Sequence, residues 1–442
     1  MSSASLVSYA YAVETQGEHG VPPNNVDYKQ MWVAGGNGWQ AAGTATDSAV
    51  VDPAMMGRQP TVTKVDLNGG LDFELSFADQ FKDLISMGIS ADGASPGDAW
   101  SVQIVTPEQD GELAIQGTGA SAVAVYLADD LSMLSTVKVG QRVKLYGFTN
   151  AINNSAFTVK SIDLVSTPNK LVFDTAYIKT PQRPTGKPVI PEVSLTTRVA
   201  SSSMVRNGRT KHTVSILDSR PDLGLYQMNP GQTVNDISFN FQPNELVKST
   251  VAFIGSSKDE QRRFGYIPLG VIGNKLGFDG EDIMSNVVTQ PYFPSLTAAK
   301  KTQVMEDGNV IDVKSVEVQI AGRAKETQGI GYLSTPSTQL AQLAPKFVMN
   351  CYFSDVAQFE KSQRAIWEDD TNSYVVKTED GLKNEMIISL PNVFLGSGTQ
   401  SGASKDGDAT FDFGEGRVVP FTDSTGATYN IQFERFSANP FI

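Results

Sequence analysis

The chain contains very few of the residues on which most catalytic and metal sites depend. Its 442 residues include one cysteine, Cys351, and two histidines, His19 and His212. A single cysteine excludes an intramolecular disulfide framework and suits a protein made in a reducing cytoplasm. Because thiols and imidazoles are so scarce, no Cys/His cluster in the sequence has the spacing of a zinc site. We therefore expect no resident metal ion and no cofactor.

Long apolar runs are also lacking. No segment approaches the roughly 20 apolar residues that a bilayer-spanning helix requires. The first residues, MSSASLVSYAYAVETQGEHG, have neither the basic region nor the sustained apolar region of a signal peptide. We expect no membrane association and no export.

The chain has fewer basic residues than acidic ones. The 35 Lys and Arg residues are outnumbered by 48 Asp and Glu residues, which gives a formal net charge of −13. Nonspecific binding to nucleic acid needs a cationic surface, so this charge argues against such binding. The same charge would suit the wall of a channel past which DNA slides, if the fold encloses one.

One segment, KHTVSILD, places His212, Ser215 and Asp218 close together in the sequence. Side chains on a strand alternate between its two faces, so these three cannot form the relay of hydrogen bonds that a serine hydrolase needs. We interpret His212 as a surface or strand residue without a catalytic role.

Other polar motifs also lack the spacing that chemistry requires. Gly117-Thr118-Gly119 has no third glycine and no following Lys-Ser or Lys-Thr, so we interpret it as a β-turn and not a phosphate loop. Glu368-Asp369-Asp370 is typical of a solvated helix end and has no signature of a glycosidase acid pair. The acids of KDGDATFDFGEG depart from the calcium-loop spacing and predict a hairpin turn. The acids of that last motif are Asp406, Asp408, Asp412 and Glu415. Because none of these motifs has the spacing that catalysis requires, we expect no enzymatic activity.

Alternation of apolar and polar residues predicts strands along much of the chain. In the clearest case, Leu71 and Phe73 alternate with Asp72 and Glu74. Each such strand should bury one face and show a polar face to water or to a partner. The predicted fold class is mainly β with a few helices. Similar alternating runs begin at Ile237, Val316, Met386 and Tyr429, and Pro391 should end the run from Met386.

Two helices are predicted among the strands. The first runs from about Phe77 to Ile85, where apolar residues follow the spacing of a buried stripe. The second runs from Asp355 to about Trp367 with a weaker stripe. Each follows a strand directly, which suggests a repeated strand-then-helix unit.

A small β domain is predicted around VGQRVKLYGFTNAINNSAFTVKSI, residues 139–162. Val143 and Leu145 share one face of a strand, and Asn153-Asn154 supplies residues that tolerate the left-handed conformation of a turn. This unit has too little apolar material to stand alone. We predict that residues 106–181 form an inserted small β domain and that 1–105 and 182–442 form a discontinuous body.

Three long segments read as irregular loops. They are residues 34–60, the proline-rich connector 180–191, and 396–408. Structureless loops of this length are uncommon inside compact domains unless they are functional. We expect them to act as arms that become ordered against neighbouring copies of the chain.

Several of these segments together resemble the tail tube (major tail) proteins of long-tailed bacteriophages. AVETQGEHGVPPNN is similar to the opening strand and loop of that family. DYKQMWVAGG and GRQPTVTKVDLNGGLDFELSFADQFKDLISMGI resemble its strand, long loop, strand and helix. VGQRVKLYGFTNAINNSAFTVKSI is similar to the β domain that many members insert after that helix. The resemblance extends through the central NGRTKHTVSILD to VAFIG region and the closing strands GLKNEMIISLPNVFL and TGATYNIQFERF, and is weakest over residues 259–301.

This resemblance implies a β-sandwich or barrel-like tail tube fold that assembles into stacked, usually hexameric, rings. The rings would form the channel for DNA ejection in the virion tail after assembly in the host cytoplasm. The implied partners are further copies of the chain and the tape measure, tail terminator and tail-tip or baseplate proteins. DNA would pass through the lumen without specific binding.

Two groups of residues are candidates for that role. Polar residues on the second faces of two strands would line the lumen, where like charge repels DNA phosphates. The first long loop would bridge successive rings. The lumen candidates are Asp72, Glu74, Glu317 and Gln319, and the loop candidates are Gly35, Gly36, Asn37, Gly38, Arg58 and Gln59.

Two other functions remain open at this point. One is another virion β protein of the neck, tail tip or head surface, which would stay a discrete oligomer. The other is a carbohydrate-binding or glycan-cleaving β protein, which would need an aromatic platform or an acid pair.

Overall fold

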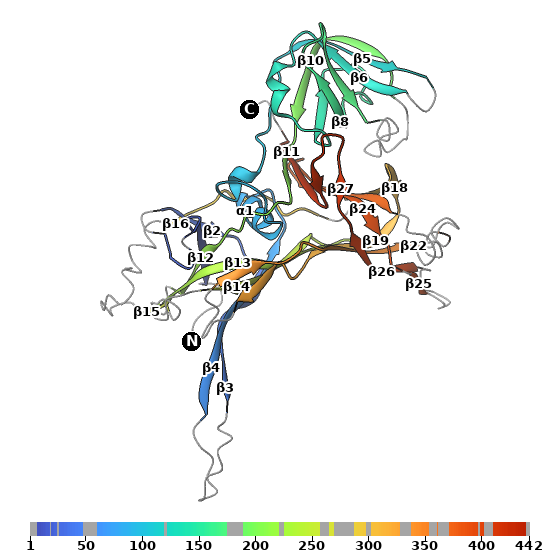
Figure 1. Cartoon of the computed structure of the whole chain (residues 1–442). Coiled ribbons are helices and arrows are strands. Elements are labelled where there is room, and N and C mark those ends of the chain that lie inside the picture. Colours follow the sequence, from blue (N-terminus) through green and yellow to red (C-terminus); the bar gives the residue numbers. More distant parts are fainter. Residues whose placement is uncertain are drawn as a thin grey trace, which may run out of the picture.

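The computed structural model is mainly β in its described part, which confirms the predicted fold class at that level. The chain forms a central body with a small barrel at one end and a long hairpin projecting from the opposite end (Figure 1). The structure describes residues 7–17, 19–23, 26–46, 60–118, 122–174, 189–220, 225–256, 265–268, 287–297, 302–327, 337–352, 360, 371–396, 398–401 and 410–438.

The body contains two layers of strands joined where β24 pairs with β26. We call them the first and second sheets. The first sheet has the order β4 (Thr61–Glu74), β14 (Lys248–Gly255), β13 (Leu225–Phe241), β19 (Val313–Ile320), β22 (Pro345–Tyr352) and β26 (Thr410–Val418). The second sheet contains β17 (Gln303–Glu306), β23 (Asn372–Glu379), β24 (Glu385–Phe394), β29 (Gln432–Phe436) and β11 (Ser203–Arg206).

Shorter strands extend these sheets or form separate hairpins. β12 (Val214–Arg220) pairs with β13 and carries β1 (Ser8–Val13), which pairs with β2 (Tyr28–Met31). The others are β3 (Gly35–Thr46), β15 (Gly265–Pro268), β16 (Val287–Val288), β18 (Asn309–Ile311), β25 (Gly398–Ser401) and the hairpins β20 (Ala324–Thr327)–β21 (Ser337–Leu340) and β27 (Phe421–Thr422)–β28 (Thr428–Tyr429).

A single apolar core lies between the two sheets. The predicted alternation holds on β4, where Leu71 and Phe73 are fully buried, and on β13 and β19 as well. Phe239 of the first sheet meets Phe433 of the second with their ring centroids 5.6 Å apart. Burial of each such side chain contributes about 1.5–3 kcal/mol, so this core holds the layers together.

The helix predicted from about Phe77 is present as α1 (Asp79–Gly88), and its apolar stripe packs into the same core. Gly88 allows close packing, because a Cβ atom there would lie 2.9 Å from Cγ2 of Ile237. The second predicted helix, Asp355 to Trp367, falls almost wholly outside the described residues. Two short 3-10 turns, η2 (Gly97–Ala99) and η4 (Ser132–Thr136), complete the helical segments described.

The small barrel is closed by six strands in the order β10-β5-β6-β9-β8-β7. Its interior holds a stacked pair, Phe157 and Phe173, with ring centroids 4.7 Å apart. The predicted boundary at residue 181 leaves out one of these strands, since β10 closes the barrel by pairing with both β5 and β7. The strands are β5 (Gln109–Gln116), β6 (Val123–Ala128), β7 (Arg142–Tyr146), β8 (Ala156–Asp163), β9 (Asn169–Phe173) and β10 (Glu192–Ser201).

Two predicted loops prove to be partly strand. Residues 35–46 form β3 and pair with β4, and residues 398–401 form β25 and pair with β26. The prediction treated glycine as a sign of irregular chain, whereas here it allows backbones to approach closely. A Cβ atom on Gly36, at a φ of +135°, would lie 2.5 Å from the carbonyl oxygen of Gly70. The connector 180–191 lies outside the described residues up to position 188.

The turn of residues 147–154 does not use the tolerance of Asn153 and Asn154 for the left-handed conformation; Gly147 takes the positive φ, at +89°. Asn154 instead donates to the carbonyl and accepts from the N–H of Phe148, which closes the turn through its side chain. Pro391 does not end its strand. It lies at an irregularity in the β23–β24 register, where the strand pairing requires no hydrogen bond from the backbone N–H that proline lacks.

Candidate functional surfaces

The structure places the four predicted lumen residues on one face of the first sheet. Asp72 and Glu74 come from β4, and Glu317 and Gln319 come from β19. Strand register aligns them in two adjacent rows across four strands. One row runs Asp72, Thr250, Ser238, Gln319, and the next runs Glu74, Lys248, Asn240, Glu317.

This surface, which we call the polar face, lies opposite the apolar core. Neighbouring residues within a row have Cβ atoms about 4.5–5.5 Å apart, so their charges influence one another. Asp72 and Glu74 are exposed, and each accepts a hydrogen bond from a hydroxyl, from Thr250 at 2.9 Å and from Ser295 at 2.7 Å. Glu317 and Gln319 are half-buried.

The polar face also carries cations that the sequence analysis missed. Lys248, Lys346 and the exposed Arg417 stand in the same rows as the predicted residues. Each of the two ammonium nitrogens lies 2.7 Å from a nearby carboxylate oxygen, that of Glu245 and Glu415 respectively. The four residues predicted from sequence therefore share this face with positive charge. Their strands lack the clear alternation seen in β4, so neither lysine was assigned to this face.

The hairpin of β3 and β4 projects beyond the first sheet (Figure 1, blue). β4 pairs with β14 only over residues 68–74, whereas it pairs with β3 out to Thr61. Among the described residues, β3 pairs with no strand other than β4. β3 contains no charged residue, so its outer edge lacks the charges that usually discourage pairing with another chain. A two-stranded hairpin is marginally stable in water, which favours a partner for its distal half.

Trp39 anchors the base of this hairpin. Its side chain is buried, and its indole N–H donates to Oε1 of Gln232 at 3.0 Å. The ring packs beside Tyr9 and Phe253. Of the six predicted loop residues, Gly35, Gly36, Asn37 and Gly38 belong to β3, and Arg58 and Gln59 lie outside the described residues.

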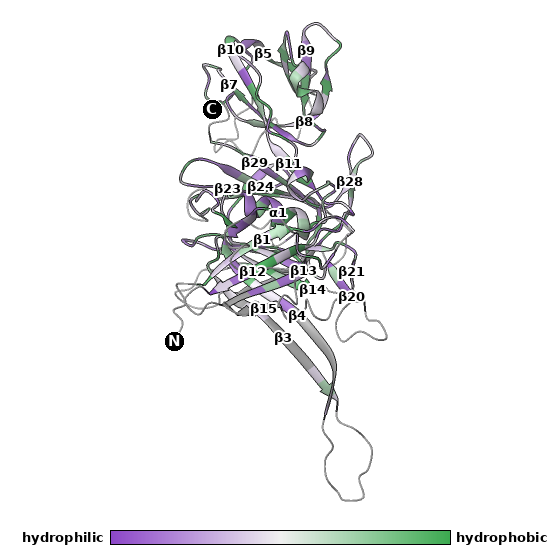
Figure 2. Ribbon diagram, turned by 90° about the vertical axis from the view of Figure 1, so that its left-hand side faces the viewer, coloured by the Kyte–Doolittle hydropathy of each residue, from purple (hydrophilic) through white to green (hydrophobic). Residues whose placement is uncertain are grey.

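Buried ion pairs join the barrel to the second sheet (Figure 2 shows the barrel above β29 and β24). The guanidinium of Arg142, on β7, donates through Nη1 to Glu434 at 3.1 Å and to Ser389 at 2.9 Å. The Arg142 and Glu434 side chains are 3% and 0% exposed, so water does not screen them.

A second cluster lies beside this pair. Oε1 of Glu385 is 2.8 Å from Nζ of Lys144 and 3.2 Å from Nζ of Lys377. Burial alone would raise the pKa of the Glu385 carboxyl, but the two ammonium groups outweigh burial and lower it. Burial lowers the pKa of the Lys144 ammonium, partly opposed by Glu385. The polar side of β7 is thus a docking surface for the body.

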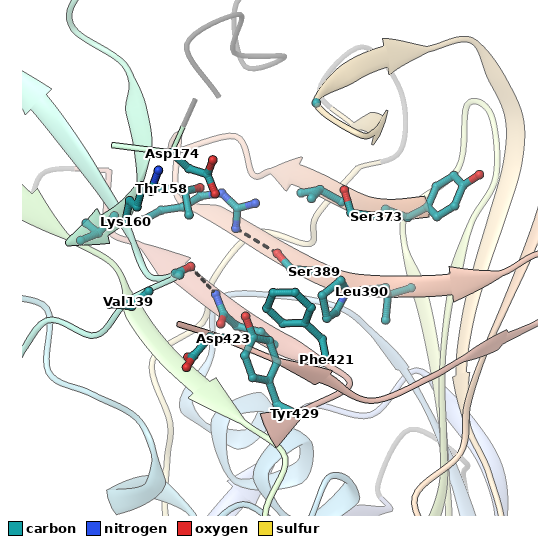
Figure 3. Close-up of a pocket in the computed structure, with 18 of the residues that line it drawn as sticks. Val139, Thr158, Lys160, Asp174, Ser373, Ser389, Leu390, Phe421, Asp423 and Tyr429 are labelled. Atoms are coloured by element: carbon teal, nitrogen blue, oxygen red, sulfur yellow. Dashed lines mark hydrogen bonds between the residues drawn. The ribbon is translucent and has the colours of Figure 1, made fainter. Parts of the chain in front are cut away.

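A cavity of about 400 Å³ lies at the same junction (Figure 3). Thr158 and Lys160 of the barrel face it from one side, and Leu390 and Phe421 of the body face it from the other. The Thr158 hydroxyl is buried and has no hydrogen-bond partner among the described residues. The cavity has the size of a small-ligand site. The described part of its lining contains no histidine or cysteine, and the Ser373 hydroxyl donates to the Asp307 carboxylate at 3.2 Å.

The other polar motifs take structural roles or lie outside the described residues. His212 is buried outside any strand, with Nε2 3.1 Å from the Ala91 carbonyl, so its assignment to the surface or a strand is wrong. Ser215 donates to Glu14. Gly117 follows β5 with a positive φ. Asp406, Asp408 and Glu368-Asp369-Asp370 are not described, whereas Asp412 and Glu415 lie exposed on β26.

No protein-family model matches this chain, and the search of curated proteins gives no significant match. Within the described residues, no group of three or more His, Cys, Asp or Glu side chains is placed to hold a metal ion. The helical segments that can be described are all too short or too polar to span a bilayer.

Proposed function

We propose that this chain is a tail tube subunit of a long-tailed bacteriophage, a structural protein without catalytic activity or cofactor. Copies would close into rings, with hexamers as the expected form, and the rings would stack into the channel for DNA ejection. The observation that carries the proposal is one sheet with an exposed polar face that continues into a projecting hairpin whose outer strand, β3, carries no charged residue.

The polar face supplies the channel wall in this proposal. Asp72, Glu74 and Glu317, which lie in two adjacent rows across the first sheet, would repel DNA phosphates at short range, within the Debye length of about 8 Å at physiological salt. The two lysines on this face each have a nearby carboxylate, whereas Arg417, which follows Lys346 in the first row, is exposed and offsets part of the negative charge at that end of the face. The barrel docks on the second sheet, beyond the core from this face, which would place it on the outside of the tube.

The hairpin supplies the contact between copies. Ring closure or stacking would cover the outer edge of β3 through backbone hydrogen bonds with a neighbouring copy. Tape measure, tail terminator and tail-tip or baseplate proteins would set the length and ends of the tube. The protein would assemble in the host cytoplasm and reside in the virion tail.

A shortened hairpin tests the proposal. Replacing residues 44–64 by Asn-Gly would join Gly43 to Val65, which pair with each other, while keeping Trp39 in place. A longer deletion over residues 35–59 would remove Trp39 and unfold the base of the hairpin. We expect the shortened variant to fold with wild-type circular dichroism and to form no tubes.

Negative-stain microscopy of both proteins gives the result. Stacked rings from the wild type and none from the variant support the proposal. Tubes of normal length from the variant would show that the hairpin does not join rings. Isolated rings from the wild type would favour a neck, tip or head-surface protein, and monomers at high concentration would refute assembly altogether.

A further inference from the structure

A second pocket, away from the barrel junction, opens beside the start of α1. Its volume is about 480 Å³, and its lining includes Phe77, Trp100, Val102, Gln103 and Arg435. Lys82 and the carboxylates of Asp79 and Asp98 also line it. Arg435 comes from β29, and Phe77 lies two residues before α1. We call it the Arg435 pocket.

Arg435 is a buried cation whose ion pair with Asp79 is long. Its side chain is 3% exposed, and its Nε and Nη1 atoms make no hydrogen bond among the described residues. Its Nη2 atom donates to the Phe77 carbonyl. The nearest carboxylate, that of Asp79, stands 4.0 Å from Nη1 and is 60% exposed. Burial lowers the pKa of the Arg435 guanidinium to about 10, with Asp79 and Asp83 opposing the shift.

The rest of the pocket supplies donors and apolar walls. Nε2 of Gln103 is also buried without an acceptor. The N-cap residue of α1, Ala78, makes no side-chain cap; its own N–H donates to the Ser76 hydroxyl at 3.4 Å, and Asp79 occupies the first turn. The guanidinium carbon of Arg435 lies 3.9 Å from the Phe77 ring centroid and 5.9 Å from that of Trp100. Val102 stands 79% exposed at the rim.

We propose that the Arg435 pocket binds a carboxylate that is attached to an apolar group. A buried charge with incomplete hydrogen bonding is costly, and an incoming carboxylate would take the place of the distant, exposed Asp79 carboxylate beside Arg435 and accept from Gln103 as well. The apolar part of the ligand would lie against Trp100 and Val102. Two sources have this chemistry, a free small acid and an acidic residue flanked by apolar residues on another copy of this chain. The inference does not depend on the proposed tail function.

Titration calorimetry with phenylacetate and with its neutral amide, phenylacetamide, tests the site in the full-length protein. We expect the acid to bind at least tenfold more tightly than the amide. Arg435→Met should lower the affinity for the acid at least tenfold. Lys160→Ala, which removes a cation from the junction cavity, should leave that affinity unchanged.

Arg435→Met should fold, because it removes a buried charge that lacks a close partner. If it does not, Gln103→Leu replaces it as the test variant and should weaken binding of the acid several-fold. Equal binding of acid and amide, binding that survives these substitutions, or no effect of the acid on the wild type in calorimetry or sedimentation would overturn the proposal.

Sedimentation of the same samples distinguishes the two sources. If phenylacetate dissociates an assembled sample, the natural ligand is a carboxylate of another copy. If it binds and leaves assembly unchanged, the site takes a free acid.

Discussion

Arg142 and Glu434 lie 292 residues apart in the chain, yet they form a hydrogen-bonded ion pair with almost no exposure to water. The alternation of Tyr429, Ile431 and Phe433 with Asn430, Gln432 and Glu434 predicted a strand with a polar side facing water or a partner. The strand is correct, but all of its residues are buried, because the barrel covers that side. A sequence pattern reports that a face is polar and does not report what covers it.

Removing one charge of this pair should be costly. Glu434→Gln leaves the Arg142 guanidinium buried without its anion, and we expect a loss of about 3–5 kcal/mol in the free energy of unfolding. Urea denaturation measures this loss. Lys248→Ala, which breaks an exposed pair with Glu245, serves as the control and should change the midpoint little. Equal effects of the two substitutions would contradict a stabilising junction.

The Glu385 cluster should make stability depend on pH. Its lysine neighbours lower the pKa of the Glu385 carboxyl below the ordinary 4.5 in the folded protein. The resulting stability is fully present above that value and is lost as the pH falls through the lower, folded pKa. We therefore expect the stability difference between wild type and Glu385→Gln to be constant near neutral pH and to shrink below about pH 4.5. Thermal unfolding across this range measures it, and a difference that grows in acid would show the sign to be wrong.

Among the elements, strands with one buried face could be predicted from sequence, and β4, β13 and β19 follow their apolar alternation. β3 could not, because its run of Gly, Ala and Thr carries no such alternation. Its strand conformation comes from pairing with β4, and only Trp39 marks the side that faces the core. The apolar alternation that predicted β4 and β19 also placed the lumen candidates on the polar sides of these strands. It could not predict the strand register or the barrel junction, because both depend on contacts between distant segments.

The base of the hairpin offers a matched pair of glycines. A Cβ atom on Gly69 would lie 2.6 Å from the Trp39 ring, whereas one on Gly70 would have its nearest neighbour at 3.8 Å. We expect Gly69→Ala to lower stability by about 1–3 kcal/mol through overpacking. Gly70→Ala should have a smaller effect in the same denaturation experiment. The reverse order would indicate that Trp39 does not occupy this position.

For the whole molecule, the barrel and the polar face lie on opposite sides of the core, which gives the assembly a defined inside and outside under the proposed function. Asp72→Lys with Glu74→Lys would replace repulsion of DNA by attraction along the channel. We expect tubes of this variant to retain DNA that a nuclease cannot reach. Cosedimentation after nuclease treatment measures this.

The control reverses the same amount of charge on the barrel, with Asp110→Lys and Asp129→Lys, both exposed. DNA held by those tubes should remain open to digestion. Equal protection in the two variants would mean that the polar face does not line an enclosed channel.

Only Ser202 separates β10, which closes the barrel, from β11, which pairs with β29 in the body. A link of one residue leaves the barrel little freedom to move relative to the body, and the nearby ion pairs resist rotation of the barrel about this link. A pull on the barrel would therefore load β11 and β29 in shear, with their four aligned residue pairs sharing the force. We therefore expect the barrel to move together with the body and not independently of it. A load applied at the surface of the barrel would be transmitted to the core.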